Sequence, residues 1–206
     1  MSLTKSLAGT WTITAARTSS QTPYSGTVQI HPMGKIYSIS WLTTLGDYSG
    51  LGFFEDGYLL AGTSNNENYG LTIYTINGDG TLDGRWTTPA SKGTIYTEKA
   101  VGGTAAQVEG IYQIAGTMTK IAGTMTNGNY EGTLDIRQLN DTYQVFWSTG
   151  INYQGVGLVL GNKLVITWGE LPIYCLGYKI QDDKAFGRWA YPDLPDLGEE
   201  NLLKIC

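Results

Sequence analysis

The chain of 206 residues is long enough for one large domain or two small ones, and it is rich in Gly (28) and Tyr (14), whereas charged residues make up only 15%. This composition is typical of β proteins with many tight turns, because glycine adopts the positive φ of hairpins and aromatic side chains suit a pleated sheet. The formal charge of −5 argues against nucleic acid as a partner, since its phosphates would be repelled.

The amino terminus does not predict a secretory signal. Residues 1–8 contain one Lys and no apolar stretch as long as the core of a signal peptide. The chain also has no run of about 18 apolar residues that could cross a bilayer. We therefore expect a soluble protein without a membrane span, located in the cytoplasm.

The first half of the chain alternates apolar and polar residues with the period of β-strands. A first strand is expected at residues 7–13, and residues 24–41 fit a hairpin with period two on both arms. A second hairpin turns at Asp56-Gly57, a pair suited to a two-residue turn because both residues then have positive φ. A third hairpin covers residues 69–86, and a strand at 93–101 completes a unit of eight strands.

The second half of the chain repeats this pattern. The stretch 130–147 follows 24–41 at a constant offset of 106 residues, and six of the eighteen positions are identical. These identical pairs are Tyr24/Tyr130, Gly26/Gly132, Thr27/Thr133, Ile30/Ile136, Tyr37/Tyr143 and Trp41/Trp147. The sequence therefore predicts an internal duplication, with a first unit at 1–101, a linker at 102–107 and a second unit at 108–206.

Consecutive hairpins joined by short turns predict an antiparallel meander. A meander of about eight strands with one apolar face is best stabilised by closing into a barrel, because closure removes exposed edges. We therefore expect an all-β protein of two tandem barrels, with one barrel in each unit. Two open sandwiches, or one larger barrel to which each unit contributes half of the strands, are the alternatives.

The start of the chain resembles a known group of barrels. The segment Leu7-Ala8-Gly9-Thr10-Trp11, with the later Gly84-Arg85-Trp86 and its counterpart Gly187-Arg188-Trp189, looks like the calycin group, which includes lipocalins and avidins. The resemblance implies that Trp11 closes one end of a barrel and that an arginine, Arg85 or Arg188, lies over such a ring. Cation–π attraction of roughly 0.5–2 kcal/mol would favour that arrangement.

No catalytic, cofactor or metal motif stands out from the sequence. The one histidine, His31, is expected to be a solvated residue, and Cys175 and Cys206 have no spacing that predicts a disulfide or a metal site. The Gly-x-Gly segments at 50–52 and 155–157 precede no helix, so they are expected to give room to a large ring from a neighbouring strand. Three carboxylate pairs are interpreted as neighbours on turns, not as catalytic pairs: Asp182/Asp183, Asp193/Asp196 and Glu199/Glu200.

The aromatic residues are the most informative candidates for function. Several lie on inward-facing rows of the expected strands, where they either fill the core or line an apolar pocket with a few polar groups. The candidate ligand-binding residues are Tyr37, Trp41, Tyr143, Trp147, Trp168 and Tyr178. The sequence thus favours a non-enzymatic binding protein for a small hydrophobic or aromatic ligand, without a cofactor. A structural or interaction module with filled barrels and a barrel-type hydrolase or isomerase are the alternatives.

Overall fold

The computed structural model describes residues 6–118 and 128–205. In these ranges the chain forms β-strands and one short 3-10 helix, η1 (Pro89–Ser91). The strands of the first half are β1 (Gly9–Arg17), β2 (Gly26–Met33), β3 (Ile36–Thr43), β4 (Gly46–Glu55), β5 (Tyr58–Ser64), β6 (Tyr69–Ile76), β7 (Leu82–Thr87) and β8 (Tyr96–Val101). Those of the second half are β9 (Gly110–Met118), β10 (Gly128–Leu139), β11 (Thr142–Ser148), β12 (Asn152–Leu160), β13 (Lys163–Gly169), β14 (Ile173–Gln181), β15 (Lys184–Ala190) and β16 (Gly198–Lys204).

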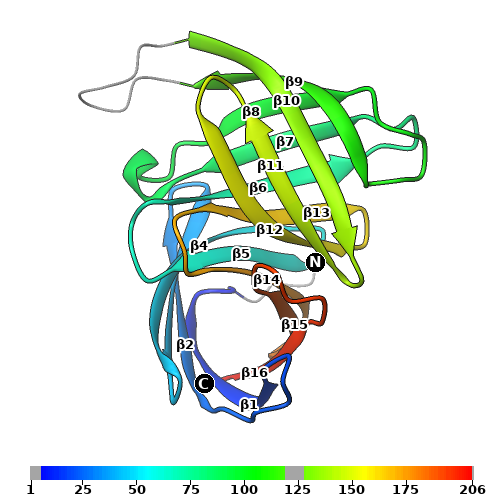
Figure 1. Ribbon diagram of the computed structural model, residues 1–206. Coiled ribbons are helices and arrows are strands. Elements are labelled where there is room, and N and C mark those ends of the chain that lie inside the picture. The colour runs from blue at the N-terminus through cyan, green and yellow to red at the C-terminus, as the bar shows by residue number, and fades with distance from the viewer. Residues whose placement is uncertain (1–5, 119–127, 206) are drawn as a thin grey trace.

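The strands form two closed antiparallel barrels. The first barrel has the strand order β1-β16-β15-β14-β5-β4-β3-β2, and the second has the order β10-β11-β12-β13-β6-β7-β8-β9. Figure 1 looks into the ring of the first barrel, whereas the second barrel above it is seen from its side. The predicted all-β fold with two barrels is confirmed.

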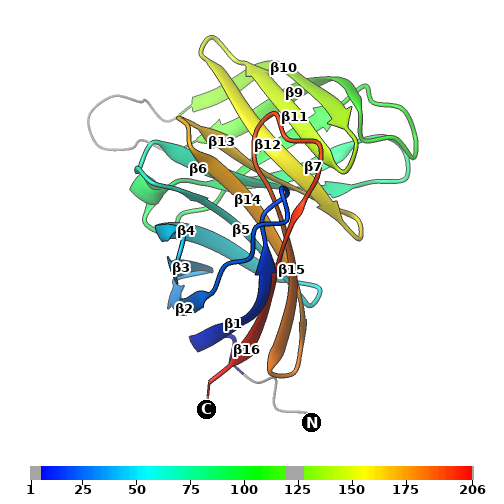
Figure 2. The same ribbon diagram turned by 60° about the horizontal axis from the view of Figure 1, so that its bottom comes forward.

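The assignment of one barrel to each half of the chain is wrong. The first barrel combines β1–β5 of residues 1–101 with β14–β16 of residues 108–206, and the second combines β9–β13 with β6–β8. The last three strands of each half therefore close the barrel of the other half. After β5 the chain does not turn back into a hairpin but crosses to the second barrel, and after β13 it crosses back (Figure 2).

The two crossovers are bonded to each other. The side-chain amide of Asn68 donates to Glu170 at 3.0 Å, and the backbone N–H of Glu170 donates to the carbonyl of Asn68, also at 3.0 Å. The Ser64 hydroxyl donates to the carbonyl of Pro172 at 2.8 Å. These bonds satisfy polar groups of the crossing segments, which have no ladder partner at this point.

An apolar core between the barrels explains why the crossing is stable. On β5, Leu59 and Ala61 face the inside of the first barrel, whereas the intervening Leu60 packs outside it against the second barrel. On β13 of the second barrel, Val165 packs outside its own barrel, in the same core as Leu60. Both faces of these strands are thus buried, and burial of each large apolar side chain contributes about 1.5–3 kcal/mol.

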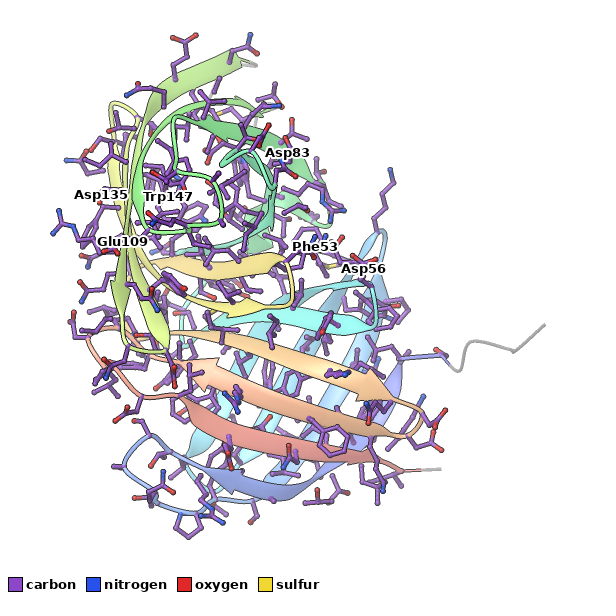
Figure 3. The ribbon with its side chains drawn as sticks, turned by 90° about the vertical axis from the view of Figure 1, so that its right-hand side faces the viewer. Phe53, Asp56, Asp83, Glu109, Asp135 and Trp147 are labelled. Carbon is purple, nitrogen blue, oxygen red and sulfur yellow. The ribbon has the colours of Figure 1, made fainter. Side chains whose placement is uncertain are left out.

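Charged and loop contacts surround this core. Glu55 at the end of β4 pairs with Arg85 of the second barrel, and Lys163 lies 3.7 Å from Glu55 and 3.3 Å from Asp56. Figure 3 shows Phe53 and Asp56 where the barrels meet. The β15–β16 loop reaches from the first barrel onto the β10–β11 hairpin, where Thr142 Oγ1 donates to a loop carbonyl at 2.9 Å.

Local predictions for two glycine-containing sites are confirmed. Asp56 and Gly57 have φ values of 52° and 80°, as a two-residue turn with positive φ requires. Gly50 lies under the ring of Trp41, and a Cβ at this glycine would come within 2.7 Å of a ring carbon. In the second barrel, a Cβ at Gly155 would instead meet Ile166 and Trp168 of the neighbouring strand β13.

The cation over the Trp11 ring is not the expected arginine. Trp11 is 1% exposed and its indole N–H donates to the carbonyl of Leu7 at 3.1 Å, but the cation over its ring is Lys204, at 5.7 Å. Arg188 is exposed, because it alternates with inward-facing neighbours on β15. Arg85 lies over Phe53 at 5.7 Å and pairs with Glu55, so neither arginine lies over the Trp11 ring.

Tyr112 takes the place of Trp11 in the second barrel. It is fully buried, and its hydroxyl donates to the carbonyl of Val108 at 2.9 Å, four residues upstream. Trp11 and Tyr112 therefore both donate a hydrogen bond to the segment that precedes their strand. No helix in residues 6–118 and 128–205 is long and apolar enough to cross a membrane.

Candidate functional site

A buried glutamate lies near the open end of the first barrel. Glu200 of β16 is 2% exposed, and its carboxylate accepts three hydrogen bonds, two from strands β3 and β14 and one from the segment before β2. Tyr178 Oη donates to Oε1 at 2.5 Å, Trp41 Nε1 donates to the same oxygen at 3.1 Å, and Tyr24 Oη donates to Oε2 at 2.8 Å.

The second barrel contains the corresponding arrangement. Glu98 of β8 is 5% exposed, and it accepts hydrogen bonds from Tyr74 and Trp147 on Oε1 and from Tyr130 on Oε2. The Trp147 bond is 3.4 Å long and the Tyr130 bond is 2.6 Å long. Figure 3 shows Trp147 inside this barrel. Each barrel therefore holds one carboxylate with two tyrosines and one tryptophan.

Strand alternation and bare glycines position these groups. Glu98 and Glu200 occupy inward positions of β8 and β16, two residues before buried Ala100 and Leu202. The rings of Tyr74 and Tyr178 lie directly on Gly84 and Gly187, where a Cβ would come within 2.6 Å and 2.2 Å of ring carbons. A side chain at either glycine would push the tyrosine away from the glutamate.

Burial controls the protonation of both networks. Burial raises the pKa of Glu98 and of Glu200, and the tyrosine and tryptophan donors offset only part of this rise. Burial and the neighbouring glutamate also raise the pKa of Tyr74, Tyr130 and Tyr178 well above the ordinary tyrosine value. The tyrosines therefore stay protonated at neutral pH and act as donors.

Neither glutamate has a cationic partner among the described residues. The ion pairs of these residues join other carboxylates, including Glu55, Asp56, Asp83 and Asp135. The neighbours that shift the pKa of Glu98 and Glu200 are neutral hydroxyls and indoles. Each carboxylate is thus stabilised by hydrogen bonds without a compensating charge, an arrangement that is costly when the group is ionised.

A second tryptophan lies close to each network. The indole N–H groups of Trp86 and Trp189 are buried and form no hydrogen bond of acceptable geometry. Burial raises the pKa of Tyr130 and Tyr24, and the nearby indoles of Trp86 and Trp189 offset part of this rise. In the second barrel, the Trp86 ring also contacts Tyr96, at a centroid distance of 4.4 Å.

A cavity opens above each glutamate. In the second barrel its volume is about 460 Å³, and it is lined by Glu98 and by the rings of Trp86, Tyr130, Trp147, Tyr153 and Trp168. A wider groove of about 920 Å³ shares Trp147, Tyr153 and Trp168 with this cavity and continues to Glu67 and Glu170. Small-molecule sites commonly have volumes of 300–1,000 Å³.

The cavity of the first barrel is smaller, at about 160 Å³. Tyr174 fills this mouth, where it contacts Tyr48 at a centroid distance of 5.2 Å and Trp189 at 5.9 Å. The second barrel has Gly70, without a side chain, where the first has Tyr174. The ring of Trp168 from the neighbouring strand covers Gly70, and this ring contacts Tyr153 at a centroid distance of 5.0 Å. The two barrels thus share the glutamate network and differ in the size of the mouth.

The structure separates the six aromatic candidates into three groups. Trp147 and Trp168 line the larger cavity, and Trp41 lines the smaller one. Tyr178 is 1% exposed and bonds to Glu200 behind the cavity wall. Tyr37 and Tyr143 pack against the barrel cores and line none of these cavities. The exposed His31 and the buried Cys175, whose pKa burial raises to about 12, take no part in either site.

Sequence reasoning did not find the two glutamates or three of their tyrosine partners. From the sequence alone, Glu98 has no assigned role, and Glu200 is expected to lie at a turn beside Glu199. The available signal was a glutamate at an inward, period-two position of the last strand in both halves of the chain. Tyr24 and Tyr130 were treated as structural residues of the repeated stretch, although they hold the carboxylates.

Comparisons with known proteins give no match for this chain: no family model, no curated protein and no solved structure is similar to it at a significant level. Within residues 6–118 and 128–205, no group of three His, Cys, Asp or Glu side chains could hold a metal ion. The function is therefore argued from the cavities and their lining alone.

Proposed function

We propose that this protein is a non-enzymatic binding protein for a small aromatic or otherwise hydrophobic molecule, held in the mouth of the second barrel. One observation carries the proposal. A cavity of about 460 Å³ is lined by five aromatic rings and ends at a single buried carboxylate. Rings supply a large apolar contact area, and one polar group fixes the orientation of a ligand.

The first barrel has a corresponding but smaller cavity, which is proposed to be too small for the same ligand. Its cavity of about 160 Å³ has corresponding walls, with Trp41, Tyr48 and Trp189 around Glu200. This volume is below the usual range for drug-sized ligands. The larger cavity is therefore proposed to determine which ligand binds.

The experiment that tests this proposal is native mass spectrometry of the protein purified from its own host. A small molecule released on denaturation and absent from the W168L variant would support binding in the second barrel. W189L, which changes the first barrel only, is the matched control and should keep the ligand. The absence of any bound molecule, with unchanged tryptophan fluorescence across a library of aromatic metabolites, would contradict the proposal.

A barrel-type isomerase or hydrolase is the second candidate, and the position of Glu98 in the cavity favours it. Glu98 faces the cavity with a raised pKa, as general acids in enzymes often do. Incubating the identified ligand with the protein and measuring the mass and retention time of the recovered compound separates the two functions. A changed compound, lost with E98Q, would favour the enzyme.

An interaction module with solid barrels is supported less well, because side chains leave space in both barrel mouths. We also infer that the resemblance to calycin barrels extends to their use of one closed and one open end. Trp11 and Tyr112 at the closed ends, and the paired glutamate networks towards the open ends, support this inference and the proposed internal duplication.

A further inference from the structure

The glutamate in the larger cavity is a negative group without a cation. Glu98 accepts hydrogen bonds from two hydroxyls and one indole, all of them neutral donors. No lysine, arginine or histidine of the described residues lines the cavity or the groove that leads to it. Oε2 accepts only the bond from Tyr130, so it has a free lone pair for one more donor.

The walls of the same cavity suit a positive charge. Trp168 lies at the centre of a ring cluster, with centroid distances of 6.1 Å to Trp86, 6.3 Å to Trp147 and 5.0 Å to Tyr153. An ammonium group near the faces of tryptophan and tyrosine is attracted by their negative π-surface. In the described part of the chain, the protein's own cation–π contacts use Phe53, Phe146 and Trp11, so the rings of this cluster are free for a ligand.

The approach to the cavity has the same charge preference. Glu67 and Glu170 line the groove that shares three rings with the cavity, and the whole chain has a formal charge of −5. Carboxylates along an entry path raise the local concentration of cations and repel anions. The groove carboxylates, the aromatic walls and Glu98 therefore all favour a cationic ligand.

We propose that the ligand of the second barrel is an amine, an aromatic or alicyclic molecule whose protonated nitrogen lies between the indole rings and donates to the carboxylate of Glu98. This inference rests on the proposed binding function and specifies its ligand class. The ammonium group supplies the countercharge that Glu98 lacks, and the ring of the ligand fills the apolar remainder of the cavity. Binding would also favour the ionised glutamate, opposing the rise in its pKa caused by burial.

Three matched probes test the proposal by isothermal titration calorimetry at pH 7: 2-phenylethylamine, 2-phenylethanol and phenylacetate. They share a ring and a two-carbon side chain and differ in charge. We expect the amine to bind at least about 10-fold more tightly than the alcohol, and the acid to bind more weakly than either. Equal affinities for amine and alcohol, or tighter binding of the acid, would overturn the proposal.

The variant E98Q tests whether Glu98 causes the preference for the amine. We expect E98Q to reduce the ratio of amine to alcohol affinity from at least about 10 to about 1. The control E131Q removes an exposed carboxylate next to Tyr130 and should keep the preference. A preference that survives in folded E98Q would contradict the proposed role of Glu98.

The outcomes also separate this proposal from the binding function. If alcohol and amine bind equally, the protein binds aromatic molecules but does not select amines. If none of the three probes binds, the binding function itself is contradicted for aromatic molecules of this size, and the amine proposal falls with it. Should E98Q not fold, the ratio of amine to alcohol affinity in the wild-type protein decides the question alone.

Discussion

The hydroxyl of Tyr178 donates a 2.5 Å hydrogen bond to Oε1 of Glu200 inside the first barrel, and Tyr74 donates to Glu98 at the corresponding place in the second barrel. The two tyrosines occupy corresponding positions in their barrels. Each ring covers the glycine directly opposite on the next strand, Gly187 for Tyr178 and Gly84 for Tyr74. The same bond therefore joins β14 to β16 in the first barrel and β6 to β8 in the second.

The variant Y178F tests the contribution of this bond to stability. It removes one donor from a buried carboxylate, which keeps only Tyr24 and Trp41. A hydrogen bond to a charged group contributes about 1.5–3 kcal/mol, so we expect the free energy of unfolding in urea to fall by this amount. Y37F is the control, since the hydroxyl of Tyr37 has no hydrogen bond among the described residues, and it should change stability by less than about 0.5 kcal/mol. Equal effects of both variants would show that Tyr178 acts only through packing.

The raised pKa values of Glu98 and Glu200 predict how stability depends on pH. Between the ordinary carboxyl pKa and the raised value, the folded protein binds more protons than the unfolded chain, so stability falls as pH rises. This stabilisation is complete below the ordinary value and is lost as pH passes through the raised value. The slope is at most about 1.4 kcal/mol per pH unit for each group.

The double variant E98Q/E200Q is the reference for this measurement, because glutamine stays neutral at every pH. We expect the wild-type protein to lose stability relative to the variant in urea titrations as the pH rises above the ordinary carboxyl pKa of about 4. A difference that does not change with pH would contradict the raised pKa values. Acid effects of the other carboxylates cancel, since both proteins contain them.

The strands and their inward-facing rows could be predicted from the sequence, because a barrel imposes a period of two on every strand. The exchange of strands between barrels could not. A connection as short as residues 65–68 fits a hairpin as well as a crossover, and only the continuous apolar run of β5 and β6 indicates burial on both faces.

The aromatic residues of the candidate site could be predicted from the sequence, whereas its glutamate could not. Trp41, Trp147 and Trp168 could be identified as aromatic residues on inward rows. Glu200 could not, because a carboxylate is placed on the surface by default and is tolerated inside only when donors reach it. Those donors include Tyr24, which is 176 positions away in the chain, so the period of the strand alone does not reveal them.

Opening the first barrel tests what limits its site. Tyr174 occupies the mouth where the second barrel has its larger cavity, and Y174A removes the ring while leaving Glu200 and Trp41 in place. We expect calorimetry with 2-phenylethylamine to change from one site to two sites per chain, at a cost in stability of about 2 kcal/mol. A stoichiometry of one in folded Y174A would show that the size of the mouth does not limit binding.

The charged contacts between the barrels predict unequal effects of two similar variants. E55Q removes the partner of Arg85 and of Lys163, whose side chain is only 7% exposed, and leaves this lysine with Asp56 alone. Breaking a buried pair can cost about 3–5 kcal/mol, and because Asp56 remains we expect a loss of about 2 kcal/mol in urea unfolding. D83N breaks the exposed pair with Lys99 and should cost less than about 1 kcal/mol. Similar losses would contradict the structural role of Glu55.

Cleavage of the linker tests the exchange of strands between the two halves. A specific protease site inserted at the exposed residues 105–106 would separate β1–β8 from β9–β16 covalently. Each barrel would still contain strands of both fragments, and each barrel core is closed only when both are present. We expect the fragments to elute together in size-exclusion chromatography and to separate only in denaturant, at a concentration close to that which unfolds the intact chain. Separation in native buffer into two folded fragments would contradict the exchanged arrangement, because it would require each half to close a barrel alone.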